Sequence, residues 1–145
     1  SPAWHHTALL ITYDEHGGYY DHVPPVAVPN PDGIAPRAAN LYGDNYTLSG
    51  FRVPTMLISP WARRNYVDSH VTDVTSILRF IEDVFLDGRR IGGGSFDAIA
   101  GTLMPLFDFT AAPDLAPLIL DEQTGAAVAA AGASVARDRW SIRRP

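Results

Sequence analysis

The stretch TALLITYDEHGGYYDHVPP, from Thr7 to Pro25, places many ionisable groups directly after an apolar run. The run itself, Thr7–Tyr13, is almost continuously apolar, which predicts a strand covered on both faces, as in a parallel sheet. Asp14 and Glu15 follow at once, and then come His16 and a Gly-Gly pair that lets the backbone turn. Ligands in open α/β sheets bind beyond the carboxyl ends of strands, so this turn is a candidate site.

A second strand and a helix are predicted further along the chain. The segment VPTMLIS, Val53–Ser59, shows the same buried-strand pattern. Asp73–Leu86 predicts a helix with one apolar stripe of the kind that faces a core, with Thr72 as a candidate N-cap and Gly88 at its end. The order of strand, long loop, strand and helix indicates an α/β fold.

The remaining segments are less regular. Gly17–Arg52 is rich in proline and shows no sustained period, which is typical of either a functional loop or a disordered insertion. Phe96–Phe109 predicts a short helix against the core, and Leu115–Leu120 a further short strand. Three aromatic residues of the long loop favour partial packing: Tyr42, Tyr46 and Phe51.

Composition limits the possible functions. The chain has 145 residues, a net charge of -5 and a pI of about 5.3, so it lacks the basic face expected of a nucleic-acid partner. It contains no cysteine, so any metal must use oxygen or nitrogen ligands. No apolar stretch approaches the roughly 20 residues of a membrane span, and no transmembrane segment is expected. With only two clear strands and a first methionine at Met56, we expect a piece of a longer polypeptide.

The opening cluster favours cation chemistry. Two neighbouring carboxylates, Asp14 and Glu15, resist ionising together unless a cation neutralises them, so a divalent metal ion of unknown identity is expected. His16 and His22 are catalytic candidates, because an imidazole can donate to a phosphoryl oxygen or protonate a leaving group. Spacing alone leaves open the alternative that Asp14 caps a turn and that both histidines lie on the surface.

Two further positions are candidates for substrate binding. His70 lies in the loop after the second strand, with Asp68 and Asp73, and could join the same cleft from another carboxyl end. The alternative for this loop is that Thr72 and Asp73 only cap the helix. Arg63 follows the second strand and could clamp a phosphate, or it could simply face solvent.

Three segments in this order carry a family resemblance: SPAWHHTALLITYDEHGGYYDHVPP, GFRVPTMLISPWARRNYVD and TSILRFIEDVFL. The chain resembles the C-terminal portion of the bacterial phosphoesterase family, which includes phospholipases C and a related acid phosphatase. The resemblance implies an alkaline-phosphatase-like three-layer sandwich with a mostly parallel central sheet, incomplete in this chain. Residues 1–125 would form the C-terminal part of the catalytic domain, and residues 126–145 an Ala/Arg-rich tail that is a candidate for disorder.

The same resemblance implies metal-dependent hydrolysis of phosphate esters, phospholipids included, in a secreted or periplasmic protein. Asp14 and Glu15 match the acidic pair that is expected to bind the metal, and His16 is their neighbour in the motif. The nucleophile and the other ligands would come from the N-terminal half of the same polypeptide, so the isolated chain is expected to be inactive.

One departure from the family pattern keeps alternatives open. Many members have an Asp-His-Thr-Ser motif at the start of the helix, whereas this chain has Asp73-Val74-Thr75-Ser76. The role of that histidine is therefore absent here, unless His70 supplies an imidazole from the preceding loop. A non-catalytic homologue that acts as a binding module therefore remains an alternative, as does a sulfatase of the same superfamily.

Overall fold

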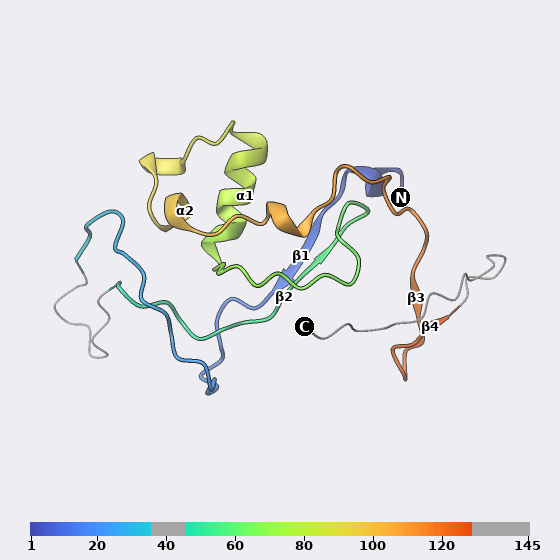
Figure 1. Ribbon diagram of the computed structural model, residues 1–145, viewed down its shortest axis with the longest axis horizontal. Coiled ribbons are helices and arrows are strands. Elements are labelled where there is room, and N and C mark those ends of the chain that lie inside the picture. Colours follow the sequence, from blue (N-terminus) through green and yellow to red (C-terminus); the bar gives the residue numbers. More distant parts are fainter. Residues whose placement is uncertain (36–45, 129–145) are drawn as a thin grey trace.

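The computed structural model describes residues 1–35 and 46–128 as a small α/β structure (Figure 1). Tyr42 and most of the predicted tail, residues 129–145, lie outside the described residues. In chain order the elements are η1 (Pro2–His6), β1 (Leu9–Thr12), β2 (Thr55–Ile58), α1 (Thr75–Phe85), η2 (Ile91–Gly93), α2 (Phe96–Ile99), η3 (Met104–Leu106), β3 (Ile119–Leu120) and β4 (Ala127–Val128), where η marks a 3-10 helix.

The two predicted strands are confirmed as β1 and β2, but the expected parallel pairing is wrong for them. They pair antiparallel, with Leu9 opposite Ile58 and Thr12 opposite Thr55. The described residues form two antiparallel strand pairs, β1–β2 and β3–β4, and no parallel sheet. The continuous apolar run therefore does not distinguish parallel from antiparallel pairing, and in this chain one apolar face of the pair is left exposed.

The connection between the strands explains their direction. A parallel pair needs a crossover, usually through a helix, whereas an antiparallel pair needs only a returning chain. Residues 22–35 and 46–51, here called the arm, run out from β1 and return to β2 (Figure 1). Ala27 bridges Leu48, and the Val28 and Ser49 amides donate across the arm to the Thr47 and Val26 carbonyls, each at 2.9 Å. The arm is therefore an irregular extension of the β1–β2 hairpin.

Helix α1 is confirmed, and its start is capped by Asp73, one of the two predicted capping residues, and not by Thr72. The Asp73 carboxylate accepts from the Thr75 amide at 2.7 Å, and Ser76 Oγ accepts from the Asp73 amide at 3.1 Å. Such reciprocal bonds satisfy amides that have no partner inside the helix. Thr72, the predicted N-cap, instead lines the pocket described below. The predicted end is confirmed: Gly88 has φ +75° and donates to the Glu82 carbonyl at 3.0 Å.

The face that α1 buries differs from the predicted apolar stripe. Glu82 and Ser76 are fully buried, whereas Phe85 is 75% exposed. Glu82 accepts from Arg90 Nη1 at 3.0 Å and from the Ile91 amide at 2.9 Å, and Arg90 also pairs with Asp83 at 2.9 Å. Because these bonds compensate for burial of the charge, the polar face can turn inward. The apolar stripe is left exposed at Val74, Ile81, Val84 and Phe85.

A row of aromatic rings connects the helices to the strand pair. Phe80 of α1 stacks on Phe107 with ring centroids 5.2 Å apart, and Phe107 stacks on Phe109 at the same separation. Phe109 contacts Trp61 at 5.8 Å, and the Trp61 indole donates to the His5 carbonyl at 2.9 Å. Phe107, Ala100 and Leu103 are the buried apolar residues, which confirms that the segment Phe96–Phe109 packs against the core.

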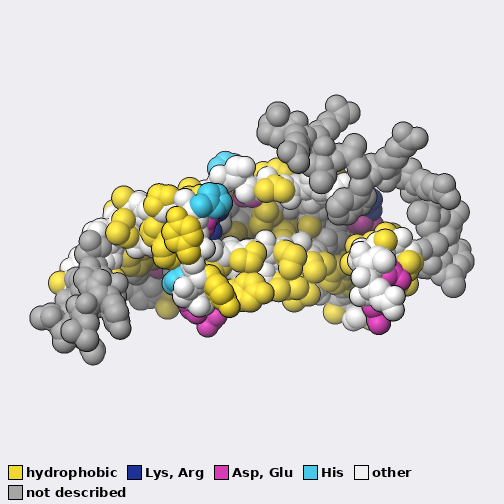
Figure 2. Space-filling view, turned by 90° about the horizontal axis from the view of Figure 1, so that it is seen from below, with side chains coloured by type: hydrophobic (Ala, Val, Ile, Leu, Met, Phe, Trp, Pro, Cys, Tyr) yellow, Lys and Arg dark blue, Asp and Glu magenta, His cyan; other side chains and the backbone are white. Residues whose placement is uncertain are grey.

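One face of the β1–β2 pair carries apolar side chains into solvent. Leu9, Ile58, Ile11 and Met56 are between 42% and 57% exposed, and the strand register places them in two opposed pairs. Figure 2 shows apolar side chains gathered in a band across one face of the molecule. Within the described residues, no helix has the length and hydrophobicity needed to cross a bilayer.

Candidate active site

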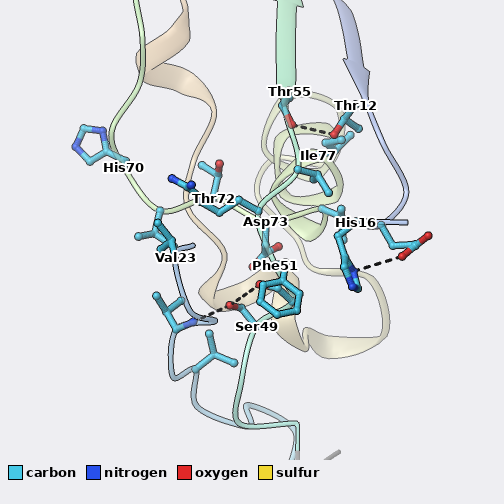
Figure 3. A pocket seen from close by; sticks show the side chains of 18 of the residues that line it. Thr12, His16, Val23, Ser49, Phe51, Thr55, His70, Thr72, Asp73 and Ile77 are labelled. Atoms are coloured by element: carbon cyan, nitrogen blue, oxygen red, sulfur yellow. Dashed lines mark hydrogen bonds and ion pairs between the residues drawn. The ribbon is translucent and has the colours of Figure 1, made fainter. Parts of the chain in front are cut away.

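A pocket of about 630 Å³ lies where β1 ends and β2 begins. That volume is within the usual range for small-molecule sites. Four segments supply most of its lining: the turn after β1, residues 23–28 of the arm, residues 49–53 that lead from the arm into β2, and the loop at residues 68–74 before α1 (Figure 3). The arm therefore forms part of the pocket wall, as expected for a functional loop.

The turn after β1, here called the acidic turn, carries Asp14, Glu15 and His16 into the pocket. Glu15 Oε2 accepts from the Gly17 amide at 2.8 Å and lies 3.4 Å from His16 Nδ1. Gly17 and Gly18 have φ of +67° and +76°, a conformation that favours glycine, so the Gly-Gly pair is what reverses the chain here. That Asp14 and Glu15 reach one centre stays a prediction, since the structure places both at the pocket without a side-chain contact between them.

Packing from the arm orients His16. Its ring centroid lies 5.0 Å from that of Phe51, and its side chain is 33% exposed. Phe51 precedes β2 and reaches His16 only because the strands are antiparallel, which puts the start of β2 beside the end of β1. The sequence predicts only a packing role for Phe51.

The loop before α1 forms the opposite wall, with His70 and His16 on different sides of the pocket (Figure 3). The expectation that this loop joins the cleft agrees with the structure, but the reason given for it was wrong. Because the strands are antiparallel, the carboxyl end of β2 lies at the opposite end of the strand pair from the pocket. The chain after β2 must therefore run back toward the pocket before residues 68–74 can line it. Asp68 Oδ1 lies 2.6 Å from His70 Nδ1 and accepts from the His70 amide at 3.1 Å.

His22 and Arg63 are placed differently from the other predicted site residues, since neither lines this pocket. The His22 side chain is 82% exposed, with Nδ1 3.4 Å from Asp21 Oδ1. Arg63 Nε donates to the Phe107 carbonyl at 3.1 Å, and its guanidinium lies 5.7 Å from the centre of the Tyr66 ring. Arg63 therefore stabilises the backbone at Phe107, in the row of aromatic rings.

An ion pair closes the base of the arm. Arg52 Nε and Nη2 donate to the two oxygens of Asp21 at 2.7 and 2.8 Å, a bidentate arrangement. These bonds from Arg52, together with one from the Val23 amide, hold the pKa of the Asp21 carboxyl well below its usual range. Arg52 lines the pocket, but its charge is already matched by Asp21.

The pocket is acidic. Its lining includes Asp14, Glu15, Asp68 and Asp73, and its arginine, Arg52, is paired. Such a surface attracts cations and repels an unaccompanied phosphate. Within residues 1–35 and 46–128, no three His, Asp or Glu side chains are grouped closely enough to hold a metal ion. The acidic turn thus offers hard oxygen ligands suited to a divalent ion, but it would need further ligands to complete the coordination.

The chain belongs to the phosphoesterase family, whose model matches residues 1–86, more than half of its length. The match covers the acidic turn, the arm, β2, the loop before α1 and α1 itself. The family prediction made from the sequence is therefore confirmed. The alkaline-phosphatase-like sandwich is not visible in this chain, whose described strands form only antiparallel pairs.

Several relatives are phospholipases C. The chain is 58% identical to non-specific phospholipase C1 of Arabidopsis thaliana over 69 residues, covering 46% of this chain and 13% of the relative. It is 38% identical to non-specific phospholipase C4 of the same plant over 115 residues, covering 68% of this chain and 21% of the relative. Hemolytic phospholipase C of Pseudomonas aeruginosa is 35% identical over 123 residues, covering 77% of this chain and 16% of the relative. The chain thus spans about a fifth or less of these relatives.

Proposed function

We propose that this chain forms part of a metal-dependent phosphoesterase that hydrolyses phosphate esters, with phospholipids as the substrate class. The observation that carries the proposal is the pocket, which joins the acidic turn of the family motif to the loop before α1. The names of the relatives support the substrate class, since they are phospholipases C. Export from the cell stays a prediction from the family resemblance.

Asp14 and Glu15 would hold the divalent ion. Both are carboxylates at the pocket, and the Glu15 oxygen that faces His16 is already oriented by the Gly17 amide. A bound ion would neutralise charge on the phosphoryl oxygens of the ester. His16, oriented by Phe51, would donate a hydrogen bond to the substrate from the same side. His22 is a weaker candidate for this role because it lies outside the pocket.

The chain would supply the C-terminal portion of the site, with the nucleophile and the remaining ligands on other parts of the polypeptide. Two observations support this division. The described residues offer no complete metal-ligand group, and the apolar faces of β1–β2 and α1 are exposed. Exposed apolar areas of this kind mark surfaces that another part of a protein covers. A non-catalytic binding module is the second candidate, favoured by Val74, which lines the pocket at the position where the motif of the family resemblance has histidine.

The test compares the chain alone with a polypeptide that holds the whole catalytic domain. Phosphate mono- and diesters are supplied with Mg²⁺, Mn²⁺, Ca²⁺ or Zn²⁺. We expect the complete domain to turn over esters only with metal, Asp14→Asn to lose at least about 100-fold in kcat/KM, and the isolated chain to be inactive. Asp121→Asn, in the β3–β4 turn outside the pocket, is the matched control. An inactive complete domain would favour the binding module, and robust activity of the isolated chain would refute the division of the site.

A further inference from the structure

Asp68 and His70 form a pair in which a buried acid holds an exposed ring. The Asp68 side chain is only 10% exposed, whereas that of His70 is 72% exposed. One carboxylate oxygen, Oδ1, contacts both the backbone amide and the ring nitrogen Nδ1 of His70. Because the contacts fix both the backbone and the side chain, the ring has a defined orientation at the pocket wall.

The contact with Asp68 determines which ring nitrogen is available to a ligand. The hydrogen bond from His70 is the main reason why the pKa of the Asp68 carboxyl lies below its usual value, so Asp68 is ionised at neutral pH. An ionised carboxylate only accepts, so Nδ1 must carry the proton of this bond. Nε2, on the other side of the ring, is then the atom that can meet a ligand.

The second oxygen of Asp68 makes His70 its main polar neighbour. Oδ2 is buried and has no hydrogen-bond partner among the described residues. The contacts of Oδ1 with the His70 amide and ring therefore carry the hydrogen bonding of this carboxylate. When the ring is protonated on both nitrogens, Nδ1–H faces Asp68 and Nε2–H is a donor toward the pocket.

A phosphate ester needs such a donor in this pocket. Seven charged or titratable groups line the pocket: Asp14, Glu15, His16, Arg52, Asp68, His70 and Asp73. Arg52 is already paired with Asp21, and His16 lies beside Glu15. His70 is the lining cation candidate that has a buried carboxylate of its own and an exposed ring.

We infer that Asp68 is a positioning residue that fixes the orientation of the His70 ring, and that His70, when both ring nitrogens carry a proton, donates a hydrogen bond from Nε2–H to a phosphoryl oxygen of the bound ester. The inference rests on the proposed function and adds a substrate contact from the wall opposite the acidic turn. The loop at residues 68–74 packs directly against the helical part of the molecule, because an added Cβ at Gly101 would overlap with the Val71 carbonyl oxygen. Tight packing of this kind keeps the pair in place between substrate-free and substrate-bound states.

The positioning role can be tested on the chain itself by nitrogen NMR of the histidine rings. In the unsubstituted chain we expect His70 to keep its Nδ1 proton when the ring becomes neutral at high pH. Asp68→Ala removes the acceptor at Nδ1, so the neutral ring should lose its preference for the Nδ1–H form. Asp121→Ala loses comparable turn hydrogen bonds far from His70 and should leave its ring signals unchanged. An unchanged tautomer in Asp68→Ala would overturn the positioning role.

The substrate contact is tested by kinetics of the complete catalytic domain. His70→Gln should lower kcat/KM for a phosphate ester by about 10²-fold, the usual effect of losing a donor to developing charge. Asp68→Asn should give a comparable loss, and the double variant should be no worse than His70→Gln, because both changes remove one interaction. His6→Gln, on the exposed end of η1, is the control.

Each result decides a separate statement. Additive losses from the two substitutions, or losses no larger than that of His6→Gln, would overturn the inference. If the unsubstituted domain hydrolysed no phosphate ester, the proposed function would fail instead, and the NMR result would still decide whether Asp68 positions His70.

Discussion

The helical part of the molecule and the β1–β2 hairpin solve the problem of burial in opposite ways. Around α1 and α2, the charged group Glu82 is fully buried and its partners Arg90 and Ile91 come from the same short stretch of chain. On the hairpin, Leu9 and Ile58 face solvent although they are apolar. The pocket is lined by residues of both the helical part and the hairpin, so its walls differ in how their side chains are buried. The helical part compensates its buried charge with its own residues, whereas the hairpin leaves apolar side chains exposed.

The largest expected effect is at Glu82. Replacing it with alanine leaves Arg90 partly buried without its main carboxylate partner, and removing one partner of a buried ion pair typically costs about 3–5 kcal/mol of unfolding free energy. The measurement is urea unfolding followed by circular dichroism. Glu122→Ala is the control, since Glu122 is exposed in the β3–β4 turn and should change stability by less than about 0.5 kcal/mol.

If Glu82→Ala behaved like Glu122→Ala, the helical part would not depend on its buried ion pair. The helical part and the hairpin would then not differ in the way described above.

A moderate effect is expected at Gly101, where the helical part meets the loop before α1. Alanine there would put a Cβ 2.1 Å from the Val71 carbonyl oxygen, so the backbone must move, at a cost of about 1–3 kcal/mol. Gly50→Ala is the matched control, because a Cβ at Gly50 meets nothing within 4 Å. Thermal unfolding gives the stability change, and the His70 ring signals report whether the loop moves. Equal melting temperatures for the two variants would contradict the close packing described here.

The smallest effect is expected at the base of the arm and depends on pH. Arg52 lowers the pKa of Asp21 in the folded chain, so the folded state favours the ionised carboxyl. The stabilisation is therefore fully present above the ordinary aspartate pKa of about 3.9, and it is lost as the pH falls through the lower folded value. Asp21→Asn should remove it at every pH.

Hydrogen exchange of the Val28 and Ser49 amides, which donate across the arm, measures this effect. Asp21→Asn should speed exchange at both amides at neutral pH and leave helix α1 unchanged. Asp121→Asn, in the other hairpin, should alter neither amide. If Asp21→Asn left the exchange of both amides unaltered, the ion pair would not hold the arm.

Local patterns predicted the elements well. The apolar runs located β1 and β2, and the spacing of apolar residues located α1. The Gly-Gly pair correctly indicated a chain reversal after Asp14 and Glu15, because its reason is local: two positive φ angles that glycine tolerates.

Features that depend on distant partners were not predicted. Burial of Glu82 could not be read from α1 alone, because the compensating donors belong to residues after the helix ends. The antiparallel direction of β2 depends on the path of the arm, which shows no regular period. The role of Asp68 had a weak local signal, since an aspartate two residues before a histidine can bond its amide, but only the fold shows that this pair faces the acidic turn.

The ion pair at the base of the arm makes the position of the pocket independent of the length of the arm. Asp21 and Arg52 fix both ends of the arm beside the acidic turn, whatever lies between Val28 and Thr47. Because each doubling of loop length costs only about 0.6 kcal/mol of closure entropy, insertions and deletions there are thermodynamically cheap. The arm can therefore change in length at small thermodynamic cost while the acidic turn keeps its place at the pocket.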